Sequence, residues 1–323
     1  MTKNDNDLKN IEDDCDDNSS ASSGSCFADM GFMFDAAQAT KTQTLQFVPT
    51  IVYEKQQGKN LDDEEELKHI FQRPISVVID CVDDNPGAVQ SGHYLWPGAP
   101  ALAQFLVDLF SSSKPILQNP QYKFIFSRLP IFSPEKSFFS IVELGAGCGL
   151  AGLTAMQLSL FQNKISSIVF TDHDPGTLDR ARENHTNTLE ILKASSKSNC
   201  DESKNEISAN TVPVIFEQLT WGDLEGISRL RTGTSDGFDL ILGSDLIYCE
   251  EVVKPLLITA AELMSKTKKS SAMIMTQSFS YEYETEEAID NACNDLSLVR
   301  TILSCELETG GVRIQTFHLK EDI

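Results

Sequence analysis

From residue 139 onward, apolar runs of strand length alternate with longer segments that have helical periodicity. Strand-like runs such as FSIVELG and SSIVFTD are each followed by a helix-like segment, and the chain closes with LVRTILS and VRIQTFHLK, which only a turn-length segment separates. Strands that alternate with helices form a parallel sheet covered on both faces, whereas a turn-length link makes two strands antiparallel. The pattern therefore predicts an α/β fold: a seven-stranded, mostly parallel Rossmann-like sheet with an antiparallel strand in a C-terminal hairpin.

The chain before these alternating segments divides into a polar tail and a pair of strands. Residues 1–42 are rich in Asp, Asn, Ser and Gly and bury too little apolar surface to fold, so they are predicted to be a disordered acidic tail. The strand-like runs 45–54 and 75–82 are predicted to form an N-terminal β-hairpin laid against the main domain. One domain is thus expected over 43–323, with the polar segment 193–210 as a disordered surface insertion.

The formal net charge of -22 narrows the choice of partners. A chain this acidic is repelled by nucleic-acid backbones and anionic membrane surfaces, so neither is an expected partner, whereas a basic protein surface fits. The N-terminal segment MTKNDNDLKN lacks the apolar centre of a signal peptide, and no apolar run approaches the roughly 20 residues of a membrane helix. A cytoplasmic protein is expected, with the nucleus as the alternative compartment.

The eight cysteines are scattered along the chain, with no CxxC pair and no Cys/His spacing that suits zinc. In a chain of this length they are expected to be mostly reduced thiols. The sequence therefore predicts no metal site.

The segment ELGAGCGLAG leaves a predicted strand and enters a predicted helix, with glycines at Gly145, Gly147 and Gly149. Glycine lets the backbone turn sharply and lets a ligand approach the main chain without an intervening Cβ atom. A dinucleotide fingerprint requires a glycine at position 150, where this chain has Leu150, so the motif departs from the NAD pattern. The next strand ends in Asp172, a carboxylate suited to both hydroxyls of a ribose. That role is common to NAD and S-adenosylmethionine.

The run LILGSDLIYCEE ends a predicted core strand on a carboxylate, Asp245, and presents a phenol at Tyr248. These residues are typical either of a strand end followed by a helix cap or of a substrate site at the mouth of a sheet. Glu250 and Glu251 are interpreted as first-turn acids that favour the helix dipole. The pattern alone leaves both interpretations of Asp245 and Tyr248 open.

The segments YLWPGAPALAQFL, ELGAGCGLAG, VFTDHD, LTWGDL and GSDLIYCEE occur in this order and together point to one family. The chain resembles the protein-lysine branch of the class I, seven-β-strand S-adenosylmethionine methyltransferases, the "methyltransferase-like" family 16. The resemblance implies S-adenosylmethionine as cofactor and methyl donor. It implies that the cofactor site is lined by Trp96, Glu143, Gly145, Ala146, Gly147, Gly149, Asp172, Trp221 and Ser244.

The function that this resemblance implies is protein-lysine N-methylation. Asp245 then holds and orients the incoming ammonium, while Tyr248 supplies a π face for the cation and a wall of the substrate slot. Methyltransferases that act on adenine or glutamine have two prolines inside this D-x-x-Y motif, where this chain has Leu246 and Ile247. The implied partner is a protein substrate with a basic surface around the target lysine, and the enzyme is expected to be a monomer.

Three other hypotheses stand beside this one. A methyltransferase for a small molecule, or for a protein side chain other than lysine, would share the cofactor residues and differ in the lid over the substrate. A non-catalytic interaction protein with the same fold has no physical need for the glycines, Asp172 and Asp245 together. An NAD-dependent dehydrogenase is disfavoured by Leu150 and by the C-terminal hairpin.

Overall fold

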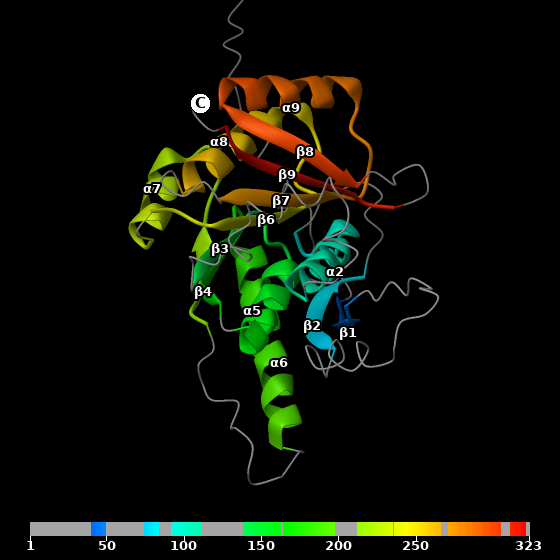
Figure 1. Ribbon diagram of the computed structural model, residues 1–323. Coiled ribbons are helices and arrows are strands. Elements are labelled where there is room, and N and C mark those ends of the chain that lie inside the picture. The colour runs from blue at the N-terminus through cyan, green and yellow to red at the C-terminus, as the bar shows by residue number, and fades with distance from the viewer. Residues whose placement is uncertain are drawn as a thin grey trace, which may run out of the picture. The chain divides into compact units, whose positions relative to one another are not determined.

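A seven-stranded sheet forms the centre of the fold (Figure 1). The structure is a computed structural model that describes residues 40–49, 74–83, 92–111, 138–162, 164–197, 212–234, 236–265, 271–304 and 311–320. The strands of the sheet are β3 (Phe139–Glu143), β4 (Ile165–Asp172), β5 (Val214–Gln218), β6 (Leu240–Ser244), β7 (Ala272–Gln277), β8 (Leu298–Ser304) and β9 (Arg313–Leu319). All described residues belong to one compact unit, Ala37–Ile323.

The strand order of this sheet is β5-β4-β3-β6-β7-β9-β8. Every neighbouring pair from β5 to β7 is parallel, while β9 is antiparallel to both β7 and β8. The order reverses between β3 and β6, and in an open α/β sheet ligands bind beside such a reversal, at the carboxyl ends of the strands. The predicted α/β fold, with its mostly parallel sheet and antiparallel C-terminal hairpin, is confirmed.

Helices cover both faces of the sheet (Figure 1). One hydrophobic core contains side chains of α2 (Gly98–Phe110) and α5 (Leu150–Gln162), with α6 (Pro175–Lys197) packed against it; the other contains side chains of α7 (Leu224–Thr232), α8 (Val253–Leu263) and α9 (Tyr283–Asp295). Successive strand residues point to opposite faces, so Leu240 and Leu242 lie in the first core and Ile241 in the second. Among the described residues, no helix is long and apolar enough to cross a membrane.

Helix α7 is absent from the sequence-based prediction. Most of its residues are polar, and its buried residues are Gly226, Ile227 and Leu230, so its apolar pattern is too short to stand out. The capping signals were nevertheless present: Asp223 is the N-cap and accepts a hydrogen bond from Glu225 N, and two arginines occupy the last turn.

The N-terminal hairpin is present, but its first strand begins at residue 40, before the predicted start at residue 45. β1 (Thr40–Phe47) pairs antiparallel with β2 (Ile75–Val82), with Leu45 opposite Val77. The β-branched Thr residues that alternate in TKTQTLQF extend the strand into the segment assigned to the tail. The other residues of that tail, and residues 50–54, lie outside the described residues.

The predicted insertion begins later than expected. α6 continues to Lys197, because KASSK contains Ala and Lys, which favour a helix. The remaining residues, 198–210, lie outside the described residues.

Candidate functional site

The glycine loop between β3 and α5 is held in a left-handed backbone conformation. Gly145 has φ +56°, Gly147 has φ +54° and Gly149 has φ +81°, values that side-chain-bearing residues rarely adopt. A Cβ atom on Gly145 would also lie 2.7 Å from Leu246 Cδ2 and 3.1 Å from Trp221 Cζ2. The missing side chain therefore lets the loop contact both the Trp221 indole and the segment after β6.

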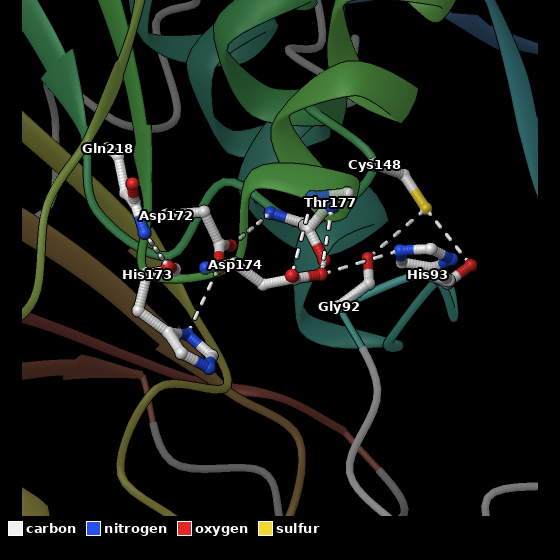
Figure 2. Close-up of polar contacts among 10 residues, drawn as sticks. Gly92, His93, Cys148, Asp172, His173, Asp174, Thr177 and Gln218 are labelled. Carbon is white, nitrogen blue, oxygen red and sulfur yellow. Dashed lines mark hydrogen bonds and ion pairs between the residues drawn. The ribbon is translucent and has the colours of Figure 1, made fainter. Parts of the chain in front are cut away.

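Asp172 joins this loop from the carboxyl end of β4. Its side chain is buried, and its Oδ2 accepts a hydrogen bond from Gly147 N at 3.1 Å. Its Oδ1 accepts a hydrogen bond from Asp174 N at 3.1 Å and lies 3.2 Å from His173 Nδ1 (Figure 2). The hydrogen bond to Asp172 raises the pKa of His173. The structure thus brings the predicted ribose-binding acid against the predicted cofactor loop.

Polar contacts hold the segment before α2, which includes Gly92 and His93, against the glycine loop (Figure 2). Cys148 Sγ lies 3.4 Å from His93 O, to which it donates, and His93 Nε2 lies 3.7 Å from Asp174 Oδ2. Asp174 caps α6 by accepting hydrogen bonds from Thr177 N at 2.9 Å and Thr177 Oγ1 at 2.8 Å. The segment that carries His93 leads directly to Trp96, so these contacts fix the approach of that indole.

Aromatic rings gather around Trp96. Its ring packs edge-to-face against Tyr94 at 5.5 Å between centroids and against Phe279 at 6.5 Å. Phe279 follows β7, so segments far apart in sequence form one aromatic wall. The other tryptophan, Trp221, follows β5, where it is half-buried and packs at the margin of the second core.

Glu143 ends β3, directly before the glycine loop. Its carboxylate is buried, and its Oε2 accepts a hydrogen bond from Gly152 N, in the first turn of α5, at 2.9 Å. Burial raises the pKa of Glu143 to about 8. The carboxyl group therefore supports the loop and the start of the helix, and its predicted contact with the cofactor stays a prediction.

The raised pKa of Glu143 gives a pH dependence of stability. A carboxyl group with a pKa near 4.5 when unfolded and about 8 when folded binds an extra proton in the folded state, so its contribution to stability falls as the pH rises between those values. Glu143→Gln removes this titration. We expect the free energy of unfolding of the variant, relative to wild type, to increase by about 1 to 3 kcal/mol between pH 5.5 and pH 8, measured by urea denaturation. A difference that does not change with pH would contradict the buried, protonated carboxyl group.

Asp245 lies where β6, β7 and α2 meet. Its φ is +53°, and its backbone N–H donates to Thr276 O at 2.9 Å. Its Oδ2 accepts a hydrogen bond from Gly98 N at 2.7 Å, and its Oδ1 accepts one from Ser278 N at 2.6 Å. A non-glycine residue in this conformation costs about 1 to 3 kcal/mol, and such strain is concentrated at functional sites. The carboxylate is thus held rigidly beside the Trp96 segment, and burial raises its pKa.

The D-x-x-Y segment is also held through Gln277, which the sequence analysis did not single out. Gln277 Nε2 donates to Ile247 O at 3.3 Å, and Gln277 Oε1 accepts from Tyr281 OH at 3.0 Å. Tyr281 OH in turn accepts from Gln315 Nε2 at 2.9 Å, and Arg300 Nε donates to Gln315 Oε1 at 2.8 Å. Burial raises the pKa of Tyr281, so its phenol stays protonated and able to donate. A buried polar network therefore links the C-terminal hairpin to the turn that carries Tyr248.

Tyr281→Phe tests this link. Loss of the hydroxyl leaves Gln277 Oε1 and Gln315 Nε2 without this partner, so the Gln277 side chain that donates to Ile247 O is held less firmly. If the protein has the predicted methyltransferase activity, we expect its transfer rate to fall by about fivefold to tenfold, while its affinity for the predicted cofactor stays unchanged. The matched control is Tyr283→Phe, at a ring that is 76% exposed. Equal initial rates of label incorporation in the two variants would contradict a role for the network.

The last two predicted residues lie at the same edge of the sheet. Ser244 ends β6 and pairs with Thr276, and Tyr248 is half-buried in the turn before η3 (Glu250–Val252). Glu250 and Glu251 are exposed in the first turn of that helix, as expected. Within the described ranges, no group of three or more His, Cys, Asp or Glu side chains is arranged to hold a metal ion.

Comparison with protein families decides which class of enzyme this arrangement represents. Residues 81–288 match the family model described as lysine methyltransferase. The chain belongs to this lysine methyltransferase family. The match spans the glycine loop, Asp172 and the D-x-x-Y motif, so the predicted resemblance to this family is confirmed.

Two curated proteins that this chain resembles carry the name protein N-lysine methyltransferase METTL21A. The Danio rerio protein is 31% identical over 125 residues, which cover 39% of this chain and 44% of the relative. The Mus musculus protein is 29% identical over 151 residues, which cover 45% of this chain and 52% of the relative. The chain thus spans about half the length of the curated relatives it matches.

Solved structures are more remotely similar to this chain. The rRNA methyltransferase aviRa from Streptomyces viridochromogenes has a TM-score of 0.40 and 13% identity, with 62% of this chain and 84% of that chain covered. A SAM-dependent methyltransferase from Agrobacterium tumefaciens also has a TM-score of 0.40 and 13% identity, with 76% and 68% covered. The family assignment rests on the match of residues 81–288.

S-adenosylmethionine is the methyl donor of the lysine methyltransferase family, and the residues of this chain fit it. The glycine loop exposes its backbone without Cβ atoms, Asp172 presents a carboxylate at the end of β4, and Trp221 faces Gly145. A loop of this kind leaves room for a ligand against the main chain, and the acid suits a ribose. Residues that sequence analysis did not single out hold the segment after β6: Gly98 and Ser278 donate to Asp245, and Gln277 donates to Ile247 O.

Proposed function

We propose that the protein transfers a methyl group from S-adenosylmethionine to the ε-amino group of a lysine in a protein substrate. The observation that carries this proposal is Asp245, which lies in a left-handed conformation at the end of β6 and is bonded to the start of α2 and the end of β7. A strained, fixed carboxylate beside an aromatic wall is suited to hold an ammonium group. The two METTL21A relatives, named as protein N-lysine methyltransferases, support the choice of lysine.

The cofactor supplies a methyl group that its sulfonium already activates. We assign its binding to Trp96, Glu143, Gly145, Ala146, Gly147, Gly149, Asp172, Trp221 and Ser244. Asp172 binds the ribose hydroxyls, and the left-handed glycines let the backbone approach the ligand. The remaining work of the protein is to align the amine with the methyl group, and orientation of this kind is worth about 7 to 11 kcal/mol.

The acceptor amine must lose a proton before it attacks, because an unperturbed lysine has a pKa of about 10.4. Desolvation between Trp96, Phe279 and Tyr248 disfavours the ammonium and lowers that pKa. Asp245 acts in the opposite direction, so its role is to bind and orient the incoming cation rather than to activate it. Tyr248 contributes a π face to the same cation.

We also propose that the substrate presents a basic surface around its target lysine and that the enzyme is a cytoplasmic monomer, with the nucleus as the alternative compartment. The net charge of -22 supports attraction to such a surface. Exposed acids also lie at the start of α9, at Glu282 and Glu284.

Labelling of a cell lysate tests the proposed function. The protein is incubated with lysate and S-adenosylmethionine that carries a tritiated methyl group, and the labelled residue is identified by mass spectrometry. We expect label on a lysine of one or a few proteins, and no label with Asp245→Ala. Label on a metabolite, or on a protein side chain other than lysine, would replace the proposal with the corresponding alternative methyltransferase.

A further inference from the structure

Over residues 76–80, the outer edge of β2 is paired with helix side chains, and at its end Val82 N donates to His93 O at 2.9 Å. Gln157 of α5 accepts a hydrogen bond from Ser76 N at 3.1 Å and donates one to Ser76 O. Thr188 of α6 accepts from Val78 N at 3.2 Å and donates to Val78 O at 3.3 Å. Buried backbone groups need such partners, so these side chains dock the N-terminal hairpin onto the helices.

The third pair on this edge involves Asn184, which is fully buried. Asn184 Oδ1 accepts a hydrogen bond from Asp80 N at 2.7 Å, and Asn184 Nδ2 donates to Asp80 O at 3.2 Å. The same Nδ2 donates to Cys148 O at 3.0 Å. The orientation of the amide is determined by its surroundings, because the reverse orientation would place its oxygen against two carbonyl oxygens.

Cys148 lies in the middle of the glycine loop, between the left-handed residues Gly147 and Gly149. The loop is also held by Gly147 N, which donates to Asp172, and by Gly149 N, which donates to Ala146 O at 2.7 Å. Glycines on both sides of Cys148 give this part of the backbone wide conformational freedom. The Cys148–Gly149 peptide is held at its N–H by the bond from Gly149 N to Ala146 O and at its carbonyl by Asn184.

We propose that Asn184 is a positioning residue for the cofactor site, which couples docking of the N-terminal hairpin to the geometry of the glycine loop. The hairpin and S-adenosylmethionine then stabilise each other through Asn184. The inference rests on the cofactor and is independent of which amine accepts the methyl group. Gln157 and Thr188 pair with the same edge of β2 but do not contact the loop in these hydrogen bonds, so they dock the hairpin without positioning the loop.

The matched variants are Asn184→Asp and Thr188→Val, both close to the shape of the native side chain. Asn184→Asp keeps an acceptor for Asp80 N but loses both donated hydrogen bonds, whereas Thr188→Val loses only bonds to β2. By calorimetry with S-adenosylmethionine, we expect Asn184→Asp to raise the Kd about tenfold and Thr188→Val to leave it within about twofold, although both lower the Tm. A wild-type Kd in Asn184→Asp, or an equal loss of affinity in Thr188→Val, would overturn the inference.

Amide hydrogen exchange of the wild-type protein gives a second test, which decides the matter if Asn184→Asp does not fold. Coupling between two sites is reciprocal, so S-adenosylmethionine must slow exchange at Asp80 N if the hairpin supports the loop. Unchanged exchange at Asp80 with saturating cofactor would overturn the inference. Failure of the wild type to bind S-adenosylmethionine would overturn it together with the cofactor assignment, whereas cofactor binding without label on lysine would overturn the proposed function alone.

Discussion

Replacement of Asp245 by asparagine is expected to reduce methyl transfer by about a hundredfold to a thousandfold, because loss of one partner of a buried charge pair costs about 2 to 5 kcal/mol. In the wild type the carboxylate accepts hydrogen bonds from Gly98 N and Ser278 N. The NH2 group of the asparagine would face one of these two N–H donors, and that hydrogen bond is lost. The initial rate of label incorporation into the acceptor protein measures the effect.

Two controls separate this loss from general damage to the enzyme. Affinity of the Asp245 variant for S-adenosylmethionine is expected to stay close to that of the wild type, because the carboxylate serves the acceptor. Glu250→Gln removes an exposed acid from the neighbouring turn and is expected to retain the wild-type rate. A wild-type rate in Asp245→Asn would show that Asp245 does not bind the acceptor.

Asp172→Asn is expected to act on the cofactor and not on the acceptor. Hydrogen bonds to a charged group contribute about 1.5 to 3 kcal/mol each, so we expect the Kd for S-adenosylmethionine, measured by calorimetry, to rise by about a hundredfold. The substitution also disturbs the contacts with Gly147 N and Asp174 N. The rate at saturating cofactor is expected to recover most of its wild-type value, which distinguishes this variant from Asp245→Asn.

The matched control for this variant is Asp179→Asn. Asp179 lies on the exposed face of α6 and pairs with Arg182, so the same chemical change leaves the cofactor loop untouched. A Kd that rises equally in both variants would show that the effect of Asp172 is one of net charge. If the rate of Asp172→Asn does not recover at saturating cofactor, Asp172 also contributes to the transfer step.

The sheet and the cofactor loop were predictable because their signals are local. A strand buried on both faces, such as Leu240–Ser244, is a continuous apolar run, and a left-handed loop requires glycines in a fixed pattern. The acid at the end of the next strand follows from the same geometry. These features depend on neighbouring residues, so one sequence is sufficient to find them.

The residues that sequence analysis did not find form hydrogen bonds with residues that are far away in the sequence. Asn184 appears as an ordinary polar residue of a helix, since its partners Asp80 and Cys148 belong to other elements. Gln277 likewise looks like a strand end until Ile247 is placed beside it. The early start of β1 was missed for a related reason, because its exposed threonines favour a strand only when β2 is available as a partner.

The strand order divides the sheet into two halves. Strands β3, β4 and β5 carry the loop, Asp172 and the approach to Trp221, whereas β6, β7, β9 and β8 carry Asp245 and the network that holds Ile247. The halves meet where β3 pairs with β6. Under the proposed function, the first half binds the methyl donor and the second half binds the acceptor, so chimaeras of relatives joined between β3 and β6 are expected to exchange substrate preference.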